Sequence, residues 1–328
     1  MSAVSGGRQK KCRVAFIGAG KMAREHIRAF ADMPGVELAG IFSRTRRHAE
    51  ALVSDFGVET VCDSIGELYE KTKADLAVIT VVETAANEIS RGCFEYPWAV
   101  LMEKPPGLNL REAREIRKAA ADKKRSAYVA LNRRFLSSTL AAAEDLKEDR
   151  GSRFLQLQDQ EDLVAAAARY PKAILDNWMY ANSIHVIDYL RIFGRGPIRK
   201  VTPILPWDPR KPGVVAAAVE FSAGDAGLYT AIWNGPGPWH VSVSTPQIRW
   251  ELRPLEQAAF QKCNERKLHP VEPSTWDHDF KPGFRKQAEE AVAAAMGRPG
   301  RLPTLDDAVE TMELIAAIYG HAPWKETP

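Results

Sequence analysis

The sequence contains few cysteines, no long apolar run and almost no excess of charge of either sign. Its four cysteines, at positions 12, 62, 93 and 263, are far apart and form no metal-type pair, so neither structural disulfides nor a metal site is expected. No segment approaches the roughly 18 apolar residues that a transmembrane helix needs. The formal net charge of +3 gives no reason to expect nucleic acid or a membrane surface as a partner. Together these absences indicate a reducing compartment, by default the cytoplasm.

The remaining composition is that of a globular protein, with 45% hydrophobic and 27% charged residues. Residues 1–11 are polar and lack the apolar region of a signal peptide, so they are predicted to be a disordered tail. From there to residue 131, short apolar strands alternate with amphipathic helices. This alternation implies right-handed crossovers and a parallel sheet, so we expect an α/β domain over residues 12–131. The predicted strands are 13–17, 36–42, 75–80, 98–102 and 127–131, and the predicted helices are 21–32, 46–56, 84–94 and 110–123.

The pattern changes in the second part of the chain, residues 132–328. Strand-like segments with period-two alternation follow one another without helices between them, which is typical of an antiparallel sheet. Two helices, 283–296 and 305–319, close the chain, and Thr304 is a plausible N-cap with Asp307 three residues on. We therefore expect an α+β domain with an open, mainly antiparallel sheet. Its predicted strands are 154–158, 214–221, 227–233, 240–244 and 247–252.

A glycine-rich loop follows the first predicted strand. Residues 18–23, GAGKMA, fit the pattern G-x-G-x-x-G/A between a strand and a helix, which is the context that dinucleotide binding requires. Gly18 allows the tight turn, Gly20 lets the backbone approach a pyrophosphate, and Ala23 permits close packing of helix on strand. The alternative is a glycine-rich turn that only packs. The loop predicts a dinucleotide cofactor.

The end of the second predicted strand indicates which dinucleotide is bound. An NAD enzyme usually has an acid here to hold the ribose 2′-hydroxyl, whereas residues 42–48 read FSRTRRH. Ser43 and Thr45 can donate hydrogen bonds to a 2′-phosphate, and Arg44 can clamp that phosphate or stack on the adenine. The alternative is a solvated basic surface. We predict NADP(H) in preference to NAD(H).

The segment Glu103-Lys104-Pro105-Pro106 ends the predicted strand at 98–102. Proline removes a ladder donor and holds the preceding residue in an extended conformation, so Lys104 should project from the tip of the strand. In a parallel α/β sheet, ligands bind outside the carboxyl ends of the strands. Lys104 is therefore a candidate site residue, and the alternative is a solvated loop lysine.

Four motifs occur in an order and spacing that resemble one family. They are GAGKMA at 18–23, EKP at 103–105, NRRF at 132–135 and IHVID at 184–188, and the segment LPTLDDA at 302–308 also fits. Together they resemble the glucose–fructose oxidoreductase/inositol dehydrogenase (Gfo/Idh/MocA) family over nearly the whole chain. The resemblance implies an N-terminal Rossmann domain, a C-terminal domain with an open antiparallel sheet, and a substrate bound between that sheet and the nicotinamide. It also implies oxidation or reduction of a hydroxyl or keto carbon on a sugar, sugar nucleotide or cyclitol.

The resemblance assigns the proton chemistry to Lys104, with His185 as the second acid–base group. Such groups typically contribute about 10²–10⁴-fold to the rate. Many family members have an aspartate four residues before the histidine, but this chain has Ala181 there. The relay is then reduced to Lys104 and His185, or is completed by Tyr180 or by the substrate. The departure leaves room for a sugar ketoreductase, or for a non-catalytic or sensor-type NADP(H)-binding protein.

The remaining predicted site residues fall into two sets. One of Arg133 and Arg134 is expected to reach the cofactor or an anionic substrate group, and the other to form a surface ion pair. The resemblance also implies a homodimer or homotetramer formed through the C-terminal sheet. The predicted cofactor residues are Gly18, Gly20, Lys21, Met22, Ser43, Arg44, Thr45, Arg47, Thr80, Glu103, Lys104 and Arg133. The predicted substrate residues are Asn132, Trp178, Tyr180, Asp188, Trp233 and His240, with Asn234 and Trp239 as further pocket candidates.

Overall fold

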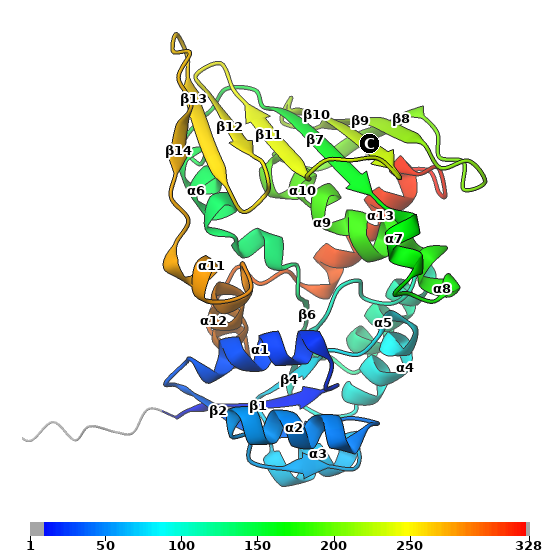
Figure 1. The fold of residues 1–328 in the computed structure, drawn as a ribbon, viewed down its shortest axis with the longest axis vertical. Helices are drawn as coiled ribbons and strands as arrows, with labels where there is room; N and C mark the ends of the chain where they lie inside the picture. The colour runs from blue at the N-terminus through cyan, green and yellow to red at the C-terminus, as the bar shows by residue number, and fades with distance from the viewer. Residues whose placement is uncertain (1–9, 326–328) are drawn as a thin grey trace, which may run out of the picture.

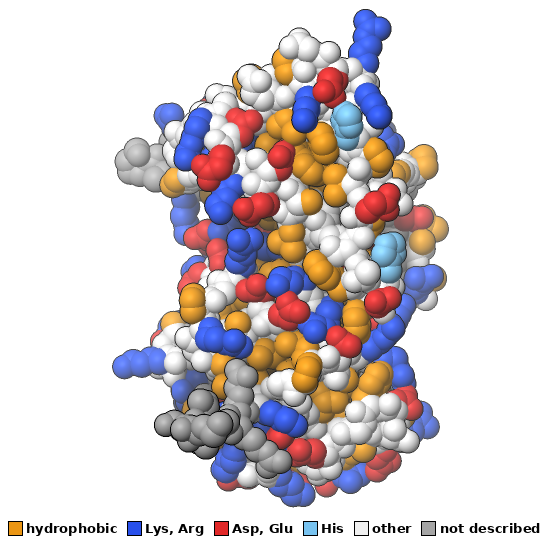
Figure 2. Space-filling view, turned by 90° about the vertical axis from the view of Figure 1, so that its left-hand side faces the viewer, with side chains coloured by type: hydrophobic (Ala, Val, Ile, Leu, Met, Phe, Trp, Pro, Cys, Tyr) orange, Lys and Arg blue, Asp and Glu red, His pale blue; other side chains and the backbone are white. Residues whose placement is uncertain are grey.

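The computed structural model of the chain describes residues 10–325 and contains two β-sheets, one toward each end of the molecule (Figure 1). The predicted disordered tail lies outside the described residues except for Lys10 and Lys11, and Lys10 forms an ion pair with Asp75 at 2.8 Å. Within the described residues, no helix is both long and apolar enough to cross a membrane. Lys and Arg side chains are interspersed with Asp and Glu over the face shown in Figure 2, in keeping with the small net charge.

The first sheet is parallel throughout and has the strand order β3-β2-β1-β4-β5-β6. The α/β prediction is confirmed. The order reverses between β1 and β4, and in such sheets the crevice at the carboxyl ends of these two strands receives the ligand. The strands are β1 Cys12–Ile17, β2 Val36–Phe42, β3 Val61–Cys62, β4 Leu76–Ile79, β5 Ala99–Met102 and β6 Ala127–Val129. The helices between them are α1 Lys21–Ala31, α2 Arg46–Phe56, α3 Ile65–Thr72, α4 Glu83–Cys93 and α5 Leu110–Asp122.

The helices of this sheet differ in how they begin. Ser64 and Asn109 cap α3 and α5 by accepting hydrogen bonds from backbone amides in the first turn. At α1 and α2 the N-cap residues, Gly20 and Thr45, make no such bond. Both helices begin just after the carboxyl ends of β1 and β2, so their first amides stay available to a ligand.

The second sheet has eight strands in the order β14-β13-β12-β11-β7-β10-β9-β8. Its pairs are antiparallel except for β7 with β10, so the prediction of a mainly antiparallel sheet is confirmed. Strand β7 runs on to Glu161, three residues beyond its predicted end at 158. The strands are β7 Phe154–Glu161, β8 Ile198–Leu205, β9 Val214–Phe221, β10 Ala226–Trp233, β11 His240–Ser244, β12 Ile248–Leu252, β13 Ala258–Lys262 and β14 His269–Val271.

Helical segments join the two sheets. A 3₁₀ turn, Asn132–Phe135, leaves β6, and a π-helical turn, Met179–Ser183, leads into α9, Ile184–Ile187. The capping box of Thr304 and Asp307 is present at the start of α13, Leu305–Ile318. The remaining helices are α6 Ser137–Asp145, α7 Leu163–Ala167, α8 Lys172–Leu175, α10 Tyr189–Phe193, α11 Thr275–Asp279 and α12 Phe284–Ala295.

Helix α12 packs on the first sheet although it lies far along the chain (Figure 1). Its residues Phe284, Ala288 and Ala291 are buried in the same core as Val14 and Phe16 of β1. The predicted division into 12–131 and 132–328 follows the two sheets, but α12 packs across it. Helix α12, from the second part of the chain, therefore packs against α1, the helix that follows the glycine loop.

Candidate functional site

A cavity of about 330 Å³ lies at the carboxyl ends of β1, β2 and β4. Six predicted cofactor residues line it: Gly18, Gly20, Ser43, Arg44, Thr45 and Thr80. Other lining residues were not predicted: Val81 and Val82 in the loop after β4, Ala85, Glu88 and Ile89 on α4, and His48 on α2. Their signal was available, because they follow the strand that adjoins the glycine loop at the reversal of strand order.

The backbone of the glycine loop has the shape that the motif predicts. Gly18 has φ +103°, and a Cβ there would lie 2.7 Å from the carbonyl oxygen of Thr80, so no side chain fits. A Cβ at Gly20 would meet no atom within 4 Å, which leaves room for a ligand beside the backbone. Ala23 is fully buried, as close packing requires. Lys21 is exposed and Met22 half-buried at the start of α1.

The basic segment after β2 has two kinds of arginine. Arg46 pairs with Glu50 at 3.0 Å and also with Asp63, so its charge is compensated. Arg44 and Arg47 are exposed and make no ion pair within residues 10–325. Unpaired cations and free amides at the N-terminus of α2 both favour an anion at this end of the cavity.

Glu103 and Lys104 lie where β5 ends. Glu103 accepts a hydrogen bond from His26 Nε2 if that nitrogen is protonated (2.8 Å), and one from the backbone N–H of Lys104 (3.2 Å). Burial alone would raise the pKa of Glu103, but the bond and charge of His26 hold it below its usual range. Glu103 thus orients the strand end from which Lys104 projects.

The Lys104 ammonium donates a hydrogen bond to the carbonyl oxygen of Ala181 at 2.7 Å. Burial, with help from nearby Arg133, lowers the pKa of Lys104, and the carboxylates of Glu103, Glu83 and Glu161 only partly oppose this. A lysine with a depressed pKa exchanges protons more readily near neutral pH. The backbone of residue 181 therefore supplies a contact to Lys104, although its side chain cannot.

His185 is buried on α9, and its ring lies 5.7 Å from that of Trp239 between centroids. Its Nδ1 has no hydrogen-bond partner within the described residues. Burial, together with the positive charges of Lys104, Arg133 and Lys281, lowers the pKa of His185 well below its ordinary value. The imidazole is therefore neutral near pH 7, with a nitrogen free for a ligand.

The structure distinguishes the two adjacent arginines. Arg134 forms a bidentate pair with Asp188, both distances being 2.7 Å, and Thr311 Oγ1 donates to the same carboxylate at 3.0 Å. This pair is buried, not at the surface as predicted, and it occupies both oxygens of Asp188, which was predicted to contact substrate. Arg133 pairs with Glu256, lies over the ring of Trp239 at 5.6 Å and keeps a buried Nε without a partner among the described residues.

Several predicted substrate residues have other surroundings. Tyr180 packs 6.3 Å from His321 and shares a surface hollow with Arg114, so it is not placed to complete a relay to Lys104. Trp233 packs on Trp207 at 4.2 Å in the core of the second sheet. The polar atoms of the other candidates are engaged: Asn132 donates to the Pro282 carbonyl, Trp178 donates to Glu161, His240 pairs with Glu251, and Asn234 accepts from the Leu163 amide.

Two buried carboxyls near the site were missed by the sequence analysis. Asp159 and Glu161 occupy inward positions of β7 and are at most 1% exposed. Glu161 accepts hydrogen bonds from Trp178, Asn182 and Ser183, while Asp159 accepts one from Tyr229 at 2.7 Å. The signal was the period-two alternation of residues 154–158, which continues for three residues but places acids, not apolar residues, at the buried positions.

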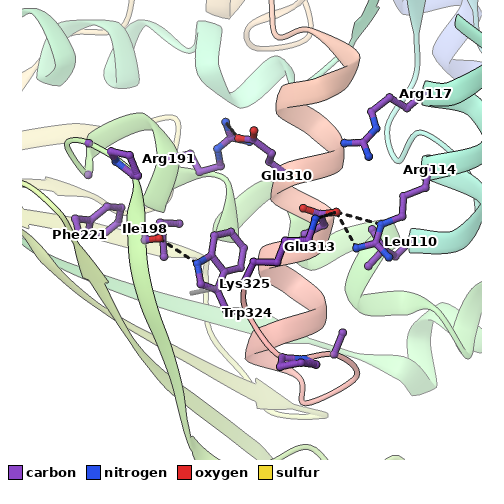
Figure 3. A pocket seen from close by; sticks show the side chains of 15 residues that line it. Leu110, Arg114, Arg117, Arg191, Ile198, Phe221, Glu310, Glu313, Trp324 and Lys325 are labelled. Carbon is purple, nitrogen blue, oxygen red and sulfur yellow. Dashed lines mark hydrogen bonds and ion pairs between the residues drawn. The ribbon is translucent and has the colours of Figure 1, made fainter. Parts of the chain in front are cut away.

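A larger cavity, of about 550 Å³, lies between α5, α13 and β8 (Figure 3). No predicted site residue lines it. Its four cations each face a carboxylate: Arg114 and Lys325 face Glu313, Arg117 faces Asp306, and Arg191 faces Glu310. Charges that are compensated within the protein give no reason to place an anionic ligand here.

The fold matches solved structures over nearly the whole chain. The levoglucosan dehydrogenase structure in complex with NADH and levoglucosan superposes with a TM-score of 0.81 at 17% identity, covering 97% of this chain and 100% of that one. This similarity concerns the fold.

Sequence comparisons match the first part of the chain. The rhizopine catabolism protein MocA of Rhizobium meliloti is 28% identical over 140 residues, which is 41% of this chain and 42% of the relative. Glucose-6-phosphate 3-dehydrogenase of Bacillus subtilis (strain 168) is 26% identical over 125 residues, which is 38% of this chain and 35% of the relative. Each alignment thus spans less than half of the relative's own length.

Residues 12–131 match the family model described as "Oxidoreductase family, NAD-binding Rossmann fold". These residues include the glycine loop and the strand end that carries Glu103 and Lys104. Residues 12–131 are therefore similar to the NAD-binding Rossmann domain of this oxidoreductase family, in agreement with the resemblance noted in the sequence.

Proposed function

We propose that this protein is an NADP(H)-dependent oxidoreductase that acts on a hydroxyl or keto carbon of a sugar, sugar nucleotide or cyclitol. The observation that carries the proposal is the placement of Lys104. It projects from the carboxyl end of β5, donates to the Ala181 carbonyl at 2.7 Å and has a pKa lowered by burial. This side chain lies at the edge of the sheet where a dinucleotide is expected.

The residues around the glycine loop fit a dinucleotide. The open space at Gly20 and the first amides of α1 would receive the diphosphate, and Thr45, Arg44 and Arg47 would hold a 2′-phosphate. When bound, the nicotinamide supplies the hydride acceptor or donor. The levoglucosan dehydrogenase neighbour was solved with NADH, so the preference for the phosphorylated cofactor rests on the residues of this chain.

The remaining task of the protein is to move a proton at the substrate oxygen. In the direction of oxidation, neutral Lys104 would take the hydroxyl proton; in reduction, its ammonium would return one. The neutral imidazole of His185 would orient the same oxygen by a hydrogen bond. Trp239, which lies beside His185, and Arg133, which lies over the Trp239 ring, would line the same pocket. A lysine, a neutral histidine and a sugar-binding aromatic face together suit a polyhydroxylated substrate.

Association through the open sheet belongs to the same proposal. Its strands carry exposed apolar side chains at Phe154, Ile204, Leu205 and Val214. Such side chains are compatible with a homodimer or homotetramer.

The direct test of the function is turnover on a panel of sugars, sugar nucleotides and cyclitols with both cofactors, followed by absorbance at 340 nm. We expect at least one substrate to be turned over in a reaction that depends on NADP(H). Cofactor binding without turnover across the panel, in both directions, would instead favour the non-catalytic or sensor-type reading.

The cofactor preference has its own test in Arg44→Ala. Because Arg44 is an unpaired cation beside the cavity, we expect this substitution to raise the Kd for NADPH about tenfold or more and to change the Kd for NADH by less than about threefold, the loss of one charge-assisted hydrogen bond being worth roughly 1.5–3 kcal/mol. Arg46→Ala is the matched control, since Arg46 is already paired with Glu50. Equal affinities of the unmodified protein for NADPH and NADH would contradict the proposed preference.

A further inference from the structure

The contact that holds Lys104 comes from an unusual piece of backbone. Ala181, whose carbonyl oxygen accepts from Lys104 Nζ at 2.7 Å, lies in the π-helical turn Met179–Ser183. π-Helical turns are rare and are often found at functional sites. The position of the carbonyl therefore depends on whatever fixes this turn.

One buried side chain binds the residues on both sides of Ala181. Glu161 accepts hydrogen bonds from Trp178 Nε1 at 2.5 Å, Asn182 Nδ2 at 2.8 Å and Ser183 Oγ at 3.2 Å. Its side chain is 1% exposed and makes no ion pair within residues 10–325. A buried carboxyl is costly unless its hydrogen bonds are satisfied, so the strand and the turn are held together through these three donors.

We propose that Glu161 is a positioning residue for the proton transfer at Lys104, because it fixes the π-helical turn whose Ala181 carbonyl directs the lysine. The proposal rests on the proposed oxidoreductase function. It also accounts for the absence of an acid at position 181. In place of an aspartate side chain, the Ala181 carbonyl contacts Lys104, and the carboxyl of Glu161 on strand β7 fixes the position of that carbonyl.

The choice of a conservative substitution for Glu161 depends on whether its carboxyl is protonated. Burial and the neighbouring Asp159 raise the pKa of Glu161 well above its ordinary value, and burial raises that of Asp159. Two neighbouring buried carboxyls that form no ion pair among the described residues are expected to share one proton at neutral pH. Glutamine reproduces this state: its oxygen accepts from Trp178 and Asn182, and its amide faces Ser183. Leucine has a similar size and removes every acceptor.

The experiment compares Glu161→Gln with Glu161→Leu on the substrate found by turnover. We expect Glu161→Leu to lower kcat by about tenfold or more with KM for the cofactor changed by less than about threefold, since a misplaced proton donor loses part of the roughly 10²–10⁴-fold that acid–base catalysis provides. Glu161→Gln should retain kcat within about threefold. Equal rates for the two variants would overturn the proposal.

A second pair of variants covers the case in which Glu161→Leu does not fold. Asn182→Ala removes one donor from the turn. Asn177→Ala removes an amide that, among residues 10–325, donates only to the Ala173 carbonyl, at 2.9 Å. We expect a lower kcat in Asn182→Ala only. Equal kcat in these two variants would count against the proposal.

Lys104 can also be followed without turnover. The rate of its acylation by acetic anhydride at fixed pH, measured by peptide mass spectrometry, reports the fraction of neutral amine. Loss of the Ala181 contact destabilises the ammonium, so acylation should become faster in Glu161→Leu and Asn182→Ala but not in Glu161→Gln or Asn177→Ala. Acylation at one rate in all four proteins would overturn the positioning role. A protein that shows the expected acylation pattern but no turnover on the panel would retain the positioning role and lose the proposed function.

Discussion

Lys104→Met should lower kcat/KM by about 10²–10⁴-fold, the range expected when a positioned acid–base group is removed. Methionine keeps much of the length of the side chain and fills the same space, but it can neither donate to the Ala181 carbonyl nor exchange a proton. Lys104 lies at the end of β5 and does not line the cavity at the ends of β1, β2 and β4. The Kd for NADPH, measured by fluorescence, should therefore change by less than about threefold.

A control variant and the pH dependence of the rate test whether the effect is specific to Lys104. Lys123→Met removes an exposed lysine that pairs with Glu95 at 2.6 Å, and it should leave kcat/KM unchanged. In addition, the oxidation rate needs neutral Lys104, so kcat/KM for oxidation should rise with pH through a pKa below the ordinary value of 10.5 for lysine. The reduction rate should fall over the same range. A Lys104→Met protein whose rate stays within about tenfold of the original would refute the assigned role.

The fold was largely predictable from the sequence because its elements are long and strongly patterned. The predicted ranges of α2, β2, β9 and β11 coincide with those of the structure. Four strands were not predicted: the two-residue β3, the three-residue β14, the five-residue β13 and the eight-residue β8. The packing of α12 on the first sheet was also invisible, because its apolar face does not specify which sheet it covers.

The candidate site was predictable where chemistry follows a motif. The glycine loop, the basic segment after β2 and Lys104 occupy the predicted edge of the parallel sheet. Glu161 was not found, because a polar residue after an alternating strand reads as the start of a loop. The surroundings of Tyr180 and Trp233 could not be predicted either, since an aromatic residue suits a core as well as a sugar site.

The pair formed by Arg134 and Asp188 is expected to be the most sensitive point for stability outside the hydrophobic cores. Asp188 is 2% exposed, and Arg134 binds both of its oxygens at 2.7 Å. Arg134→Met would leave a buried carboxylate whose remaining side-chain donor, among residues 10–325, is the hydroxyl of Thr311. We expect a loss of about 3–5 kcal/mol in the free energy of unfolding, measured by chemical denaturation, as for other broken buried pairs.

The double variant Arg134→Met with Asp188→Leu separates the cost of an unpaired charge from the value of the pair. Because it leaves no buried charge, it should recover most of the lost stability, whereas additive losses would show that packing and not charge is responsible. Arg210→Met, at an exposed pair with Asp208, should change stability by less than about 0.5 kcal/mol.

The pair of Arg134 and Asp188 also joins the 3₁₀ turn after β6 to the residue that follows α9, the helix that carries His185. Arg134→Met and the double variant should therefore reduce kcat as well. A stable double variant with low kcat would show that Arg134 and Asp188 act by fixing the position of His185.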